Sequence, residues 1–151
     1  MAESAPVIPS ASGGQSQTMR LHAVLAGWAV DIGGTTLFSM VWGTLLSIAV
    51  LTAGGDEAEL QAAMRTVPLL AFIMLTGAGF TVLGGFAAAF IAGRDELWHA
   101  LATGILSLLT GILFIVISRE QSPLWYNVTA LLVTLPCALA GGWLRLLLRR
   151  R

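Results

Sequence analysis

The chain contains four long apolar segments separated by short polar connections. A helix needs about 20 apolar residues to cross the hydrocarbon core of a bilayer, and each segment reaches that length. Helices are the only unclosed structures that satisfy their own backbone hydrogen bonds in lipid. The sequence therefore predicts an all-α integral membrane protein with a four-helix transmembrane bundle. The segments cover about residues 21–53, 66–92, 97–117 and 124–148.

Composition agrees with this interpretation. Apolar residues make up 56% of the chain and charged residues 11%, whereas a soluble domain carries roughly 25% charged residues. The formal net charge is zero, which gives no electrostatic reason to expect nucleic acid as a partner. Cys137 is the only cysteine, so no internal disulfide or paired-cysteine metal site is expected. We expect a lipid bilayer as partner, and no metal or cofactor.

The polar flanks and the arginines set the expected domains and orientation. Residues 1–18 are rich in Ser, Ala, Gly and Pro and are expected to be a disordered tail without a signal peptide. The transmembrane domain should cover residues 19–148, followed by a basic end at 149–151.

Six arginines fall on the side that holds both termini and two on the other, which predicts cytoplasmic termini. Four of them should contact lipid phosphates: Arg145, Arg149, Arg150 and Arg151.

Two pairs of short stretches suggest an internal duplication. The first pair is HAVLAG (22–27) and HALATG (99–104), and the second is LGGF (83–86) and AGGW (140–143). The chain would then consist of two parallel hairpin repeats. The alternative is a chance match between segments that are both rich in Ala and Gly, and the sequence leaves both interpretations open.

Small residues recur at four-residue spacing in the second segment, which keeps them on one face of a helix. Such stripes let two helix backbones approach closely in lipid. The first and third segments carry shorter versions of the pattern. We expect these residues to pack the four helices of one chain or to form an oligomer interface. They are Gly27, Gly34, Gly77, Gly85, Ala89, Gly93, Gly104 and Gly111.

Asp31 is the one carboxylate inside an apolar segment. A lone Asp at the bilayer centre costs roughly 2.5–3.5 kcal/mol, so it should be protonated, paired or beside water. Alignment with the third segment places Asp31 near the bilayer centre, whereas the length of the first segment allows a position near the cytoplasmic interface. The candidate partners are His22, Arg94, His99, Thr35, Thr81, Thr103 and Ser107. A hydrogen bond that fixes packing and a protonatable transport site are both compatible with Asp31.

The connection AGRDELWHA (92–100) holds the other dense group of polar residues. Gly93 is expected to end the second helix, and the two acidic residues suit the start of the third. Arg94 can reach the phosphate surface. His99 follows Glu96 by three residues, but no further ligand completes a metal or catalytic set.

The stretches GWAVDIGGT (27–35) and GGFAAAFIAGRDELWHALATG (84–104) resemble a group of small bacterial inner-membrane proteins with four predicted helices, most of them uncharacterised. The resemblance covers about residues 22–145. It implies a bacterial plasma-membrane location and implies no activity.

The leading functional hypothesis is a small non-enzymatic structural or accessory subunit, acting through helix packing in a homo-oligomer or with other membrane subunits. The alternative is a proton-linked or small-solute permeation protein with Asp31 in the path. An enzyme that acts on lipid at GRDELWH (93–99) is a third. The surroundings of Asp31 separate the first two, because a carboxylate that opens on a cavity favours transport and a sealed one favours packing.

Overall fold

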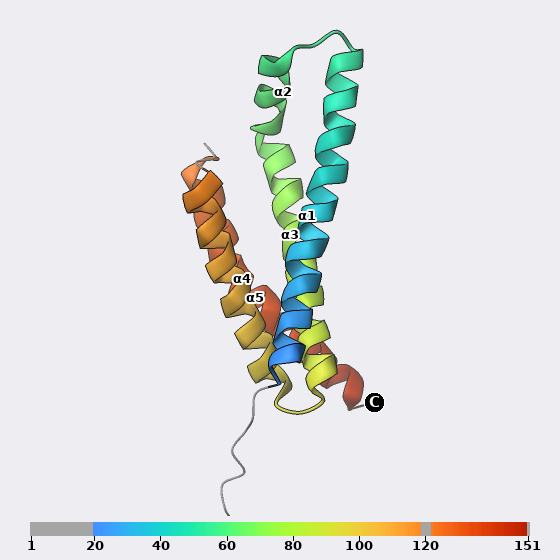
Figure 1. The fold of residues 1–151 in the computed structure, drawn as a ribbon, viewed down its shortest axis with the longest axis vertical. Helices are drawn as coiled ribbons and strands as arrows, with labels where there is room; N and C mark the ends of the chain where they lie inside the picture. The colour runs from blue at the N-terminus through green and yellow to red at the C-terminus, as the bar shows by residue number, and fades with distance from the viewer. Residues whose placement is uncertain (1–19, 119–121, 151) are drawn as a thin grey trace, which may run out of the picture.

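The computed structural model describes residues 20–118 and 122–150, and these residues form an all-α bundle (Figure 1). The tail at 1–18, Arg119 and Arg151 lie outside the described residues. Four helices are long and apolar enough to cross a membrane, so the chain is a multi-pass membrane protein whose outer surface contacts lipid. The helices are α1 (Leu21–Thr52), α2 (Glu57–Met64), α3 (Val67–Ala92), α4 (Glu96–Ser118) and α5 (Leu124–Arg149).

The short helix α2 lies in the polar connection where the sequence analysis placed no helix. The Asp56 side chain accepts a hydrogen bond of 2.9 Å from the Glu59 backbone N–H. This N-cap satisfies one of the first unpaired donors of the helix, and the acidic first turn suits the helix dipole. In Figure 1, α2 continues roughly along the line of α3 and lies beside the end of α1.

The four long helices form two antiparallel hairpins, α1 with α3 and α4 with α5. Helix α3 packs against α1, α4 and α5, and is the central element. Helices α1 and α5, although both are described, do not pack on each other. The hairpins meet where α1 begins and α5 ends, and diverge toward α2 (Figure 1). We call these the joined end and the open end.

Glycines allow close backbone contact at the joined end. A Cβ added to Gly85 of α3 would collide with the Ala138 carbonyl of α5, and one added to Gly141 of α5 would collide with the Val82 carbonyl of α3. On each helix the contacted carbonyl lies three residues before that helix's own glycine: Ala138 before Gly141 on α5, and Val82 before Gly85 on α3. The contact is therefore reciprocal. A duplication would produce such a crossing, and it remains a hypothesis.

The remaining small residues contribute unequally to packing. A Cβ on Gly27 would lie 2.5 Å from the Gly84 oxygen, and one on Gly104 would lie 2.8 Å from the Ala138 Cβ. Gly34 faces the Phe80 ring. The other glycines of the predicted stripes make no such close approach: Gly77 and Gly111 have neighbours at 3.9 and 3.5 Å, and Gly93 has none within 4 Å. Gly93 instead ends α3 in a left-handed conformation, with φ +67°.

Candidate functional site

Asp31 lies on the inner face of α1 and is 3% exposed. The Thr81 hydroxyl of α3 donates a hydrogen bond of 2.9 Å to Asp31 Oδ1, and the same hydroxyl lies 3.1 Å from the Gly77 carbonyl one turn earlier. The expected hydrogen bond to a hydroxyl of a neighbouring helix is therefore present. Gly84 makes room for Asp31, because a Cβ at Gly84 would lie 2.9 Å from the Asp31 Cβ.

The level of Asp31 in the bundle follows from the contacts between α1 and α4, which run side by side. The Arg20 N–H donates to His99 Nε2 at 3.0 Å, and the Trp28 indole donates to the Thr110 hydroxyl at 3.0 Å. Asp31 is therefore level with the middle of α4, where Ser107 approaches its carboxyl group. This agrees with the alignment of Asp31 to the middle of the third apolar segment.

Asp31 borders a cavity of about 190 Å³ that all four long helices line. Ser107, 5% exposed, lines this cavity, and its hydroxyl lies beside the Asp31 carboxyl group. Most of the cavity lining is apolar, and each of the four long helices contributes at least one polar residue. The polar residues of this inner cavity are Asp31, Thr35, Thr81, Ser107, Tyr126 and Thr134.

A second cavity, of about 560 Å³, lies between the hairpins on the α2 side of the first. It shares Ile73 and Tyr126 with the inner cavity, so the two are adjacent. Its lining includes Ser39 of α1, Gln61 of α2 and Ser122 before α5. We call it the outer cavity. The lining of the outer cavity also includes the basic residue Arg65, the C-cap of α2.

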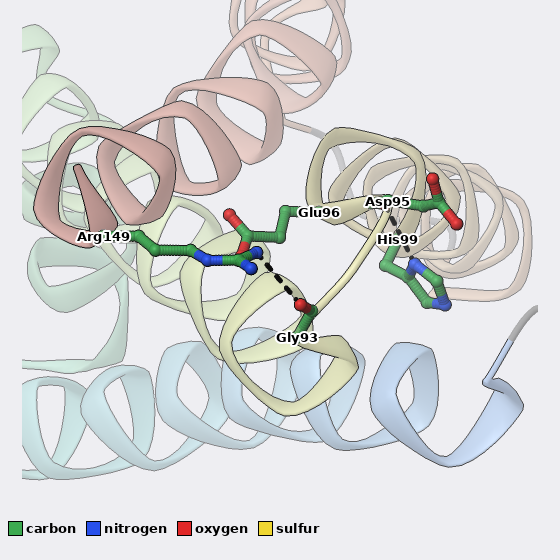
Figure 2. A network of polar contacts seen from close by, with 5 residues as sticks. All are labelled: Gly93, Asp95, Glu96, His99 and Arg149. Atoms are coloured by element: carbon green, nitrogen blue, oxygen red, sulfur yellow. Dashed lines mark hydrogen bonds and ion pairs between the residues drawn. The ribbon is translucent and has the colours of Figure 1, made fainter.

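The joined end is closed by polar contacts (Figure 2). Glu96, at the start of α4, is buried, and its Oε1 accepts from Arg149 at 3.1 Å. Arg149 also donates to the Gly93 carbonyl at 3.1 Å. His99 Nδ1 lies 3.0 Å from the Asp95 carbonyl, and its Nε2 accepts from Arg20. These two bonds require a neutral His99 with the proton on Nδ1.

The structure does not bring His99 or Arg94 to Asp31, although both were candidate partners. His99 is buried at the joined end, and Arg94 is exposed in the turn between α3 and α4. Thr35 is not a hydrogen-bond partner of Asp31 but lines the inner cavity. Thr103 bonds to backbone carbonyls, with the His99 carbonyl at 3.0 Å.

The terminal arginines divide between packing and exposure. Arg145 lies over the Phe90 ring, 4.7 Å from its centroid, which is a cation–π contact. Arg149 pairs with Glu96 while its side chain stays 58% exposed, and Arg150 is exposed. Contact of these arginines with lipid phosphates stays a prediction.

The sequence analysis missed Tyr126 and Thr134 as members of the site. They lie eight residues apart on α5 with Ala130 between them, and this spacing places all three on one helix face. All three line the inner cavity. A polar and small stripe in the fourth segment was therefore the signal available in the sequence.

No protein-family model, curated protein or solved structure matches the chain. Within residues 20–118 and 122–150, no group of three or more His, Cys, Asp or Glu residues is placed to hold a metal ion. The chemistry of the site therefore rests on one carboxylate and the surrounding hydroxyls.

Proposed function

We propose that this chain is a small permeation protein that carries a proton or a small solute across a membrane, with Asp31 as its binding group. The observation that carries the proposal is that a buried carboxylate borders a cavity whose lining includes hydroxyl-bearing residues from all four long helices. An ionisable group inside a membrane segment is by default a candidate for a solute or proton path. The adjacent outer cavity supplies an approach from the open end.

The proposal includes a location and an orientation. We place the joined end, with both termini, in the cytoplasm because the arginine asymmetry favours it. The outer cavity then faces the exterior of the cell. We propose a bacterial inner membrane as the location, which rests on the resemblance of residues 22–145 to small proteins of that membrane. In this arrangement the path is open to the outside and closed to the cytoplasm.

We propose no enzymatic role. Glu96 and His99, the polar pair of GRDELWH (93–99), are buried and engaged at the joined end. Neither of them lines the inner or the outer cavity. Their contacts support a role in closing one end of the path.

The test is flux into liposomes that contain the purified full chain. An imposed pH gradient should drive acidification reported by an internal dye, or uptake of a small solute coupled to it. Asp31→Asn retains shape and hydrogen bonding but removes the exchangeable proton, so flux should fall to the level of empty liposomes. Glu57→Gln removes an exposed carboxylate of α2 and should leave flux unchanged. Wild-type flux no greater than that of empty liposomes would refute the proposal.

A structural or accessory subunit is the second candidate. Gly33 of α1 and Gly79 of α3 have nothing within 4 Å of an added Cβ, so these small residues are unused in packing the single chain. Small residues on the outer surface of a membrane helix suit contact with another helix. A homo-oligomer or a partner subunit on α1 or α3 would use them. Native mass measurement in lipid nanodiscs distinguishes a monomer from such an assembly.

A further inference from the structure

The charges around Asp31 restrict what can bind there. Its described neighbours Thr81, Ser107 and Cys137 carry no positive charge. The ion pair within the described residues is Glu96 with Arg149 at the joined end. An isolated ionised carboxylate is strongly disfavoured in an apolar environment. The group is therefore neutralised by a proton or by one positive charge that enters from outside.

The oxygen groups of the inner cavity restrict the ligand further. Carboxylate and hydroxyl oxygens suit hard cations, and they also accept hydrogen bonds from an ammonium group. Asp31 is the only acidic residue that lines this cavity. A divalent ion would therefore keep one uncompensated charge in a largely apolar site, which is strongly disfavoured. The buried Ser107 hydroxyl lies beside the Asp31 carboxyl group, so it is placed to serve as one more ligand.

From these observations we infer that the inner cavity is a binding site for one small monovalent cation, which exchanges with the proton of Asp31. This deepens the proposed function and rests on it, because it names the class of solute that the path would carry. The cavity volume is about 190 Å³, and a water molecule takes up about 30 Å³ in the liquid. The space therefore accommodates a metal ion with several waters, or a small ammonium ion, but not a bulky organic cation.

The exchange is balanced in charge and in protons. The neutral acid of Asp31 and one cation become a carboxylate–cation pair, and one proton leaves to solvent. The other titratable groups near the carboxyl group are Cys137 and Tyr126, both on α5. The cavity-lining residues of α3 and α4 include none: Ile73, Met74, Gly77, Ala78, Thr81, Ser107 and Gly111. The Asp31→Asn variant therefore distinguishes a proton released by Asp31 from one released by Cys137 or Tyr126.

The experiment measures proton release from the purified full chain in weakly buffered detergent as salts are added. Sodium and potassium chlorides test whether the site binds a monovalent metal ion, and methylammonium chloride tests whether it binds a small ammonium ion. At least one should release about one proton per chain, with saturation. Magnesium and tetrabutylammonium chlorides at equal ionic strength should release none. Saturable release by magnesium or tetrabutylammonium, or no release with any of the small monovalent cations, would overturn the inference.

Variants locate the effect within the cavity. Asp31→Asn should abolish the release, and Glu57→Gln should retain it. Ser107→Ala removes the hydroxyl beside Asp31 and leaves Thr81 as the hydrogen-bond partner of the carboxyl group. The chain should therefore fold while the affinity falls about tenfold, as for loss of one hydrogen bond to a charged group. Unchanged affinity in Ser107→Ala, or release that persists in Asp31→Asn, would place the cation elsewhere.

The two proposals fail separately. Saturable proton release in detergent without flux in liposomes would leave the cation site standing and remove the permeation role. Flux without cation-dependent proton release would retain the permeation role and overturn the cation site.

Discussion

Asp31 contacts two kinds of neighbour that have different effects. The Thr81 hydroxyl stabilises the carboxyl group through a hydrogen bond, while Gly84 allows it to approach α3 closely. On its other side the carboxyl group borders the inner cavity. The same residue therefore joins two helices and faces a cavity, so a packing role and the proposed binding role are separable by substitution.

At Asp31 we predict that Leu destabilises the bundle and Asn does not. Asn retains an acceptor for the Thr81 hydroxyl, whereas Leu leaves this buried hydroxyl without its partner on α1. The loss with Leu should be about 1 kcal/mol, in the range of interhelical hydrogen bonds in membranes. Unfolding in mixed detergent and SDS measures it. Equal stability of the Leu and Asn variants would mean that the hydrogen bond contributes nothing to packing.

The sequence predicted the chemistry of this residue better than its geometry. A carboxylate in an apolar segment needs a polar partner, which restricted the candidates to a few residues including Thr81 and Ser107. His99 and Arg94 were equally plausible because both suit a carboxylate. Their separation from Asp31 depends on the level at which α1 lies beside α4, and this level is set by contacts such as Trp28 with Thr110. Spacing along one helix does not contain that information.

Among the helices, α3 has the central position because it packs against the other three long helices. Its small residues face two neighbouring helices, since Gly84 faces α1 and Gly85 faces α5.

Long apolar runs were enough to predict the four long helices to within about one residue at each end. The short α2 was missed, although Asp56 and Glu59 form the spacing of a capping box, because a polar connection next to membrane spans was expected to lack a helix.

Gly85→Ala should destabilise the bundle, and Gly79→Ala should not. The new methyl group at position 85 meets the Ala138 backbone carbonyl, which cannot move aside as a flexible side chain would. Overpacking of this kind costs roughly 1–3 kcal/mol. At position 79 nothing lies within 4 Å, and Ala favours a helix over Gly by about 1 kcal/mol. Thermal unfolding in detergent compares the same substitution at two sites of one helix, and equal effects would contradict the described α3–α5 crossing.

The whole chain forms two hairpins that are tightly packed at one end and apart at the other (Figure 1). The inner cavity lies between α1 and α5, which do not pack on each other. This space could not be predicted from the sequence, because it depends on the angle at which α3 crosses α5. The small-residue pattern indicates close contact without giving the angle.

The orientation of the two ends is testable by labelling in intact cells. The arginine asymmetry predicts that a membrane-impermeant maleimide reaches Glu57→Cys in α2 and does not reach Arg94→Cys in the turn before α4. Both positions are exposed in the structure, so burial does not explain a difference between them. Cys137→Ala removes the native thiol in both variants. Labelling of position 94 alone would reverse the orientation and place the outer cavity in the cytoplasm.

The unequal lengths of the hairpins have a mechanical consequence. Helix α1 has 32 residues and α4 has 23, which correspond to about 48 Å and 34 Å at a rise of 1.5 Å per residue. A bilayer of uniform thickness matches only one of these lengths, and the longer helix then tilts to bury its apolar surface. Because α1 lines both cavities, its tilt changes the distance between the hairpins. We therefore expect the acyl-chain length of the surrounding lipids to change the width of the space between the hairpins.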